Sequence, residues 1–264
     1  MSDVPTEAPT AVPVGDVVAF CDRLLEAGAF ADYGPNGLQV PGPETVSTVV
    51  TGVSAHQALF RAAAAHGADL VLVHHGLFWR GGDLALDAVA AGRLKLLLAN
   101  DMALAAYHLP LDGHPEIGNN ALLAGALDAD GVTPAFPHGG RTIGTIASFG
   151  GEGLSVPAFT ERLAAAVGGR PPLHLPGGPA LIRRVGIVSG SAADDVTAAA
   201  ALGCDAFVTG EPAERATALA QELGVHVFAA GHHATETFGV RALGDLLARH
   251  FGIAHVWVDV PNPV

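Results

Sequence analysis

The stretch "LVLVHHGLFWR" (residues 70–80) sets an apolar run directly before two histidines. Residues 70–73 are continuously apolar, which is typical of a strand buried on both faces of a parallel sheet. His74 and His75 follow where such a strand ends, and Gly76 opens the turn after them. In α/β sheets, ligands bind at the carboxyl ends of the strands. The stretch therefore predicts an α/β protein with polar chemistry at this strand end.

The segments around this strand alternate between helical and strand-like patterns. Strands are expected at 48–53, 69–73 and 102–108, and helices at 16–28, 56–67, 86–101 and 119–127. Asp16 is a plausible N-cap of the first helix. Residues 32–44 are dense in glycine and proline and are expected to form a loop. Alternation of this kind is typical of the α/β class.

The second half of the chain repeats the pattern of the first. Residues 50–76 and 185–211 both run strand, serine, alanine-rich helix, Gly-x-Asp, strand and a polar pair, with Ser54 matching Ser189. In each half a later histidine is followed four residues on by a carboxylate, as His108→Asp112 and His232→Glu236. We therefore predict two similar α/β lobes related by an internal repeat, at 14–130 and 131–264. Residues 131–142 would join them, residues 1–13 would form a flexible arm, and no third domain is inserted.

Composition narrows the function classes. The 264-residue chain is 50% hydrophobic, carries a formal net charge of −13 and contains a single lysine, Lys95. Binding to duplex nucleic acid is disfavoured because it rests on neutralising phosphates, although a local arginine cluster could still hold one phosphate. Cys21 and Cys204 are expected as buried thiols, which favours a reducing cytoplasm. The N-terminus lacks the pattern of a signal peptide, and no long uncharged apolar run suggests a membrane span.

Polar residues follow several predicted strands, at 74–75, 108, 209–211 and 232–233. Imidazoles and carboxylates gathered in one pocket suit a divalent ion such as zinc, manganese, iron, cobalt or nickel. Bridging carboxylates can hold two such ions about 3.5–4 Å apart. Each motif alone has a structural explanation, as a core histidine pair or a helix cap. Their joint occurrence at strand ends favours a metal centre.

Five motifs together resemble the Nif-three-like family, whose bacterial members are often called GTP cyclohydrolase 1 type 2 homologues. They are "GPNGLQV" (34–40), "LVHHGLFW" (72–79), "HLPLD" (108–112), "VTGE" (208–211) and "GHHATETFG" (231–239). They span nearly the whole chain in the family's order. The family pattern usually has proline after the two histidines, where this chain has Gly76. That departure should change the turn and leave the ligands as they are.

The resemblance implies a Nif-three-like fold with two lobes around a centre of two divalent metal ions, in a toroidal homohexamer. Carried over by motif position, the ligands would be His74, His75, Asp112, His232 and Glu236. His108 would lie beside the ligands or activate water. Asn36, Gln39 and Glu211 could line a substrate pocket, and hydrogen bonding within their loops is an equal alternative.

Two classes of function follow. The first is a metal-dependent hydrolase acting on a nucleotide or another phosphoester-type small molecule, of which GTP ring opening would be a narrower form. The second is a non-enzymatic metal-binding assembly or regulatory platform. Hydrolytic turnover with a bound metal ion separates the two.

Overall fold

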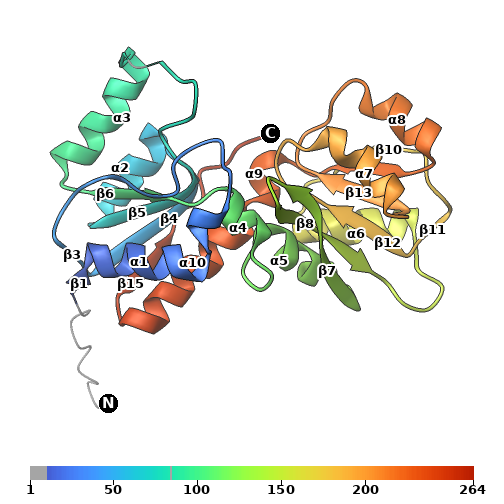
Figure 1. Ribbon diagram of the computed structural model, residues 1–264, viewed down its shortest axis with the longest axis horizontal. Coiled ribbons are helices and arrows are strands. Elements are labelled where there is room, and N and C mark those ends of the chain that lie inside the picture. Colours follow the sequence, from blue (N-terminus) through green and yellow to red (C-terminus); the bar gives the residue numbers. More distant parts are fainter. Residues whose placement is uncertain (1–10, 84) are drawn as a thin grey trace. The chain divides into compact units, whose positions relative to one another are not determined.

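The computed structural model describes residues 11–83 and 85–264 (Figure 1), and these divide into two compact units. Unit 1 comprises residues 11–28, Asp32–His108 and Val240–Val260, and unit 2 comprises Ala29–Ala31, Leu109–Gly239 and Pro261–Val264. The division differs from the expected boundary near residue 130. Residues 109–130 belong to unit 2, and the C-terminal segment returns to unit 1, where it adds a parallel strand beside β4 (Thr48–Ser54).

Within the described residues, unit 1 is built on a five-stranded sheet with strand order β15-β4-β5-β6-β2. The β15, β4, β5 and β6 strands are parallel, and β2 closes one edge antiparallel to β6. Figure 1 shows α2 and α3 on one side of this sheet and α1 and α10 on the other. The elements are β1 (Val12–Pro13), α1 (Val14–Leu24), β2 (Gly37–Val40), β3 (Thr45–Val46), β4, α2 (Gln57–Ala65), β5 (Leu70–His75), α3 (Ala88–Ala99), β6 (Ala103–Ala106), most of α10 (Thr237–Phe251) and β15 (Ala254–Trp257).

The core of unit 1 explains the central position of β5. Val71 and Val73 pack towards Leu59 and Phe60 of α2, and all four side chains are at most 1% exposed. Leu70 and Leu72 are equally buried on the opposite face. The prediction of a strand buried on both faces is therefore confirmed.

Unit 2 is built on a six-stranded sheet in the described part of the chain, with strand order β10-β14-β13-β12-β8-β7. The β12, β13 and β14 strands are parallel, and the flanking strands β8, β7 and β10 are antiparallel. Its elements are α4 (Leu109–Gly113), α5 (Asn119–Ala126), β7 (Gly131–His138), β8 (Arg141–Ser148), β9 (Leu154–Ser155), α6 (Val156–Ala166), β10 (Leu173–Leu175), β11 (Leu181–Ile182), β12 (Arg184–Ile187), α7 (Val196–Ala201), β13 (Ala206–Thr209), α8 (Ala216–Leu223), β14 (His226–Ala229) and α9 (His232–Thr235), with 3-10 turns at Ala27–Ala29 and Ala193–Asp195.

Two hydrophobic clusters cover the faces of this second sheet. Phe159 and Leu163 of α6 pack with Phe228 on one face. Val196 of α7 and Ala220 of α8 pack with Phe207 and Val227 on the other. Unit 2 is thus also a layered α/β structure, so the predicted α/β class holds for both units.

Three local expectations from the sequence were wrong. Residues 131–142, expected as a linker, form the hairpin of β7 and β8. The expected loop 32–44 contains β2, whose residues pair with β6. Pro13, not Asp16, occupies the N-cap of α1, and Asp16 lies in its first turn. In the second case long-range pairing of β2 with β6 outweighed the local glycine and proline signal.

Of the expected arm, residues 1–10 lie outside the described residues, and Val12–Pro13 form β1, paired with Thr45–Val46. The segments compared as a repeat each contain parallel strands joined through a helix. Their relation as a repeat stays a prediction. Among the described helices, none is long and apolar enough to span a membrane.

Candidate functional site

His74 and His75 are the last residues of β5, so the strand itself carries both imidazoles. His74 is fully buried. Neighbouring side chains on a strand usually point to opposite faces. Here the two ring centroids lie only 4.7 Å apart, with their planes tilted by 51°. The end of β5 therefore presents two imidazoles close together.

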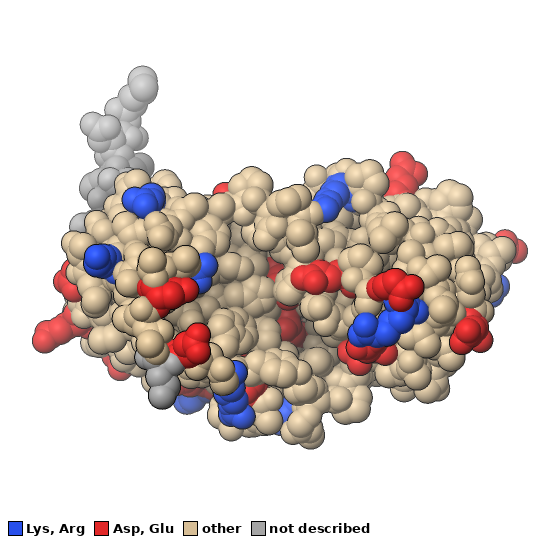
Figure 2. Space-filling model, turned by 90° about the horizontal axis from the view of Figure 1, so that it is seen from above, with Lys and Arg blue, Asp and Glu red and all other residues tan. Residues whose placement is uncertain are grey.

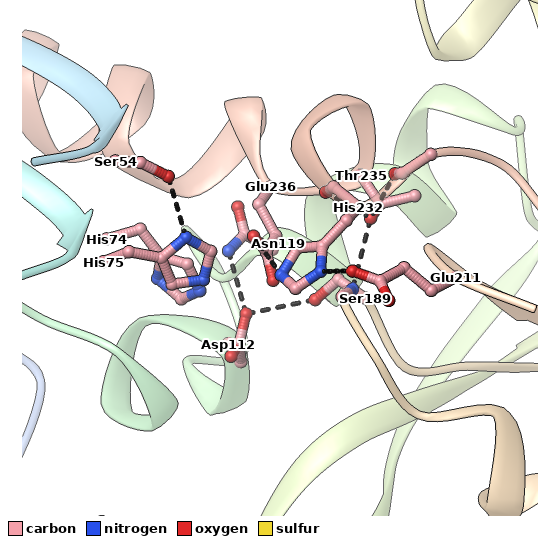
Figure 3. A network of polar contacts seen from close by, with 12 residues as sticks. Ser54, His74, His75, Asp112, Asn119, Ser189, Glu211, His232, Thr235 and Glu236 are labelled. Atoms are coloured by element: carbon pink, nitrogen blue, oxygen red, sulfur yellow. Dashed lines mark hydrogen bonds and ion pairs between the residues drawn. The ribbon is translucent and has the colours of Figure 1, made fainter. Parts of the chain in front are cut away.

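Each of these rings is held by a partner from a neighbouring segment. The backbone carbonyl of Tyr107 lies 3.0 Å from His74 Nδ1. Because a carbonyl only accepts, Nδ1 of His74 carries a proton, and in the neutral ring the lone pair then lies on Nε2. The Ser54 hydroxyl, at the end of β4, lies 3.0 Å from His75 Nδ1 (Figure 3). Partners of this kind orient the ring of a metal-ligating histidine.

His108 completes a cluster of three histidines in unit 1. Ring nitrogens of His74, His75 and His108 lie within 4.8 Å of one another, close enough to share a metal ion. His108 Nδ1 is 2.7 Å from Asp32 Oδ1. Burial by itself would raise the pKa of Asp32, but the hydrogen bond and charge of His108 and the bond from Asn36 lower it below its usual value. The carboxylate is therefore ionised and able to hold the His108 ring.

Trp79 connects the histidine cluster to a surface cavity of unit 1. Its ring meets that of His108 edge to face, with 5.2 Å between centroids, and lies 6.0 Å from that of His75. The side chain is 40% exposed. The cavity has a volume of about 540 Å³ and is lined by Leu77, Phe78, Trp79, Leu86, Arg93 and Leu94, among others. The large side chains after Gly76 thus form one wall of this cavity.

In unit 2, Asp112 is the centre of a buried hydrogen-bond network. Its Oδ1 accepts bonds from Asn119 Nδ2 at 2.8 Å and from Ser189 Oγ at 3.1 Å (Figure 3). Asn119 is fully buried, and Asp112 and Ser189 are each 8% exposed. A carboxylate oxygen of Asp112 lies within 4.8 Å of one from Glu236. Unit 2 therefore holds two buried carboxylates close together.

His232 lies between two carboxylates of the same unit. Its Nε2 is 3.2 Å from Glu236 Oε2, and its Nδ1 is 2.5 Å from Glu211 Oε1. The spacing of four residues at the entry of α9 and α10 brings His232 and Glu236 to one face, as expected. Burial alone would lower the pKa of His232, but Glu236 and Glu211 together raise it to about 9. The imidazole is consequently protonated at neutral pH in the metal-free protein.

Two glycines allow the backbone to approach this cluster. Gly190 has φ +69°, and a Cβ there would overlap Glu236 Oε1. A Cβ at Gly210 would collide with backbone atoms of Gly190 and His232. The amides of Gly210 and Glu211 both donate to the Gly190 carbonyl, at 2.8 and 2.9 Å. The "TGE" motif thereby fixes the turn that carries Glu211.

The structure gives the three expected pocket residues hydrogen bonds within their own units. Asn36 Nδ2 donates to Asp32 Oδ2 at 2.9 Å, and its Oδ1 accepts from the His108 amide at 2.8 Å. Gln39 bridges the Pro35 carbonyl and the Leu77 amide, each at 2.8 Å. Glu211 holds His232. A substrate-contacting role for these residues stays a prediction.

Gly76 illustrates the departure from the family pattern. A Cβ at this position would overlap the amide of Gln39. The Gln39 side chain therefore fills the space beside the turn that a larger residue would need. The two histidines before it are the last residues of β5, and the expected difference in the turn stays a prediction.

Sequence reasoning did not identify Asp32, Ser54, Asn119 or Ser189 as partners of the candidate ligands. A signal was present for two of them. Ser54 and Ser189 occupy matching places in the two compared segments. Each contacts a candidate ligand, His75 and Asp112 respectively. Asp32 and Asn119 had no comparable signal, because their partners are fixed only by the tertiary fold.

Comparisons with known proteins agree with the motifs. Residues 12–263 match the family Duf34/NIF3 (NGG1p interacting factor 3). A Pseudomonas aeruginosa protein named GTP cyclohydrolase 1 type 2 homolog is 44% identical over 253 residues, covering 96% of this chain and 99% of its own. A protein of the same name from Escherichia coli K12 is 43% identical over 248 residues, covering 92% and 96%.

Solved structures show the same fold. Protein ybgI, described as of unknown function, superimposes with a TM-score of 0.88 at 40% identity, covering 96% of this chain and all of its own. TTHA1606 from Thermus thermophilus gives 0.87 at 34% identity with the same coverage. The chain belongs to the Duf34/NIF3 family.

Proposed function

We propose that the protein is a metal-dependent hydrolase of a nucleotide or another phosphoester-type small molecule. Its centre would hold two divalent ions on His74, His75, Asp112, His232 and Glu236. One observation carries the proposal: four of these five candidate ligands have an orienting partner within their own unit. Tyr107 and Ser54 hold the two histidines of β5, Asn119 and Ser189 hold Asp112, and Glu211 holds His232.

The donor set fits a transition metal. Imidazole nitrogens and carboxylate oxygens suit zinc, manganese, iron, cobalt and nickel. Outer partners that orient such ligands typically change metal affinity or activity 10- to 100-fold when removed. Bound divalent ions supply Lewis acidity towards a phosphoryl or purine-ring substrate and make water more acidic.

The chain's own residues would position the substrate and move protons. His108 lies beside His74 and His75, with one ring nitrogen held by Asp32. Its other nitrogen could take a proton from water or return one to a leaving group. The cavity beside Trp79 has the volume of a small-molecule site. Its aromatic and aliphatic lining suits a planar ring.

A small molecule is a better candidate than nucleic acid. On the face in Figure 2, the Lys and Arg side chains of the described residues lie in small separate groups, several of them beside Asp or Glu side chains. Duplex binding needs many simultaneous phosphate contacts. The net charge of −13 points the same way.

The test uses purified protein loaded separately with zinc, manganese, iron, cobalt or nickel. A panel of nucleotides and phosphoesters, including GTP with detection of the pterin product, should reveal hydrolysis that requires metal. Asp112→Asn is the sharpest variant, because an amide oxygen in the place of Oδ1 can keep the bonds from Asn119 and Ser189. It removes the negative charge and should lower activity and bound metal at least tenfold.

Two outcomes would count against this function. Unchanged activity in Asp112→Asn would contradict the ligand set. Tight binding of two ions per chain without turnover on the whole panel would favour the metal-binding platform instead. That alternative finds support in the exposed apolar side chains Leu86, Val89 and Leu98 of unit 1, which suit an assembly.

We also propose that the protein assembles as a homohexamer in the cytoplasm, as the family resemblance implies. Light scattering on a size-exclusion column should then give six times the chain mass of 26.6 kDa. A monomer or dimer mass at micromolar concentration would contradict the assembly.

A further inference from the structure

Asp32 is a buried carboxylate that contacts both His108 and the residue that holds the His108 backbone, Asn36. The residue is 4% exposed although it lies in a glycine- and proline-rich stretch. Burying an ionised carboxylate is costly unless hydrogen bonds replace its water. Asp32 Oδ1 accepts from the Tyr33 amide at 2.6 Å and lies 2.7 Å from His108 Nδ1, and Oδ2 accepts from Asn36 at 2.9 Å.

These contacts fix both the backbone and the ring of His108. The Oδ1 atom of Asn36 accepts a hydrogen bond from the His108 amide, and its Nδ2 atom donates one to Asp32. Asp32, Asn36 and His108 therefore form a closed ring of three hydrogen bonds. The ring of Tyr33 lies 6.0 Å from that of His108, and Trp79 meets it from another direction at 5.2 Å. The imidazole consequently has little rotational freedom.

The chemistry of the pair selects one tautomer. An ionised carboxylate only accepts hydrogen bonds, so Nδ1 of neutral His108 must carry the proton. The lone pair then lies on Nε2. Since Nδ1 is occupied by Asp32, Nε2 is the nitrogen available towards His74 and His75.

We propose that Asp32 is the positioning residue of His108, fixing its Nδ1-protonated tautomer and ring orientation so that Nε2 can accept and return a proton during hydrolysis. The inference rests on the proposed function for its catalytic consequence. The tautomer itself is a property of unit 1 and can be measured without turnover. In water the Nε2-protonated form of histidine is generally preferred, so a fixed Nδ1-protonated ring is a distinctive signature.

The experiment compares the full-length wild type with Asp32→Ala and with the double variant Asp32→Asn/Asn36→Asp. In the double variant, the amide oxygen at 32 can accept from His108 Nδ1, and the carboxylate at 36 can accept from the amide at 32 and from the His108 backbone. All three hydrogen bonds of the ring are thus retained, while the negative charge moves from position 32 to position 36. It is the matched control for loss of folding.

The readouts are ring ¹⁵N chemical shifts of His108, assigned with His108→Gln and recorded at about pH 8.5, well above the ordinary histidine pKa, and steady-state kinetics of the zinc-loaded protein. Wild type and double variant should show protonated Nδ1, whereas Asp32→Ala should shift towards protonated Nε2. The kcat of Asp32→Ala should fall roughly 10- to 100-fold, with KM changed much less. The double variant should recover most of that kcat.

The two hypotheses fail separately. A wild-type Nδ1-protonated His108 in a protein without hydrolytic activity would contradict the proposed function and leave the positioning intact. An unchanged His108 spectrum in folded Asp32→Ala would overturn the positioning role, whatever the activity. A normal kcat in Asp32→Ala despite the altered tautomer would overturn its catalytic consequence.

Discussion

Gly190 lies directly against Glu236, and the space between them leaves no room for a side chain at position 190. A Cβ at position 190 would overlap Glu236 Oε1 and come within 3.2 Å of His232 Nε2. The same residue has φ +69°, a backbone region that favours glycine. The carbonyl of Gly190 also receives the amides of Gly210 and Glu211. One glycine thus fixes both the turn and the placement of a candidate ligand.

Gly190→Ala should therefore lower both stability and metal content. A left-handed backbone costs a non-glycine residue roughly 1–2 kcal/mol, and displacement of Glu236 adds to this. Gly203→Ala is the matched control, because Gly203 has φ +71° and nothing within 4 Å of an added Cβ. Denaturant unfolding and metal analysis should show similar strain in both variants, with metal loss in Gly190→Ala only. Equal metal content in the two would contradict the role assigned to Glu236.

The sequence was most informative where local pattern and burial coincide. The apolar run before His74 predicted β5, its burial and the polar strand end together. The spacing from His232 to Glu236 predicted their common face. These inferences succeed because strand burial and helical periodicity are recorded within a few neighbouring residues.

The features that the sequence did not reveal depend on contacts between distant residues. The unit boundaries depend on β15, which pairs with a strand some two hundred residues earlier. Asp32 acquires its role only through His108, 76 residues away. The amide of Gln39 bridges two backbone segments through Pro35 and Leu77, and the second of these contacts spans 38 residues. No local pattern encodes which distant partner a polar side chain will meet.

Both cysteines should be unreactive in the folded protein. Burial, followed by the charge of Asp22, raises the pKa of Cys21 to about 12, and burial also raises that of Cys204. Since the thiolate is the nucleophile, a thiol reagent at pH 8 should titrate neither of the two cysteines in the native state. In guanidinium chloride it should titrate both. Rapid modification of one thiol before unfolding would show that its surroundings are more open than the structure has them.

Two helical glycines should respond in opposite ways to alanine. In α10, a Cβ at Gly244 would overlap the imidazole of His255, which lies 2.8 Å from both Asp245 and Thr51. In α5, a Cβ at Gly125 meets nothing within 4 Å. Alanine in an open helical position stabilises by roughly 0.5–1 kcal/mol, whereas overpacking typically costs about 1–3 kcal/mol.

Chemical denaturation should therefore give a higher free energy of unfolding for Gly125→Ala and a lower one for Gly244→Ala. The double variant Gly244→Ala/His255→Ala distinguishes the cause, because removing the imidazole removes the overlap. If Gly244→Ala remains equally costly in the His255→Ala background, the packing against His255 is not the reason for glycine at this position.

Trp79 should report ligand binding in the cavity of unit 1. The chain has two tryptophans, Trp79 at the cavity and Trp257 on β15 against Arg241. In Trp257→Phe, Trp79 is the remaining tryptophan, and nucleosides or nucleotides should quench its fluorescence in a saturable way by stacking. Trp79→Phe should show no saturable quenching, and ribose 5-phosphate, which lacks an aromatic base, should quench neither variant.

Removing the ring in Trp79→Ala should weaken binding by roughly 1–3 kcal/mol, the range for stacking of one base on an aromatic side chain. Equal affinity in Trp79→Ala and wild type, measured by calorimetry, would place the substrate away from this cavity.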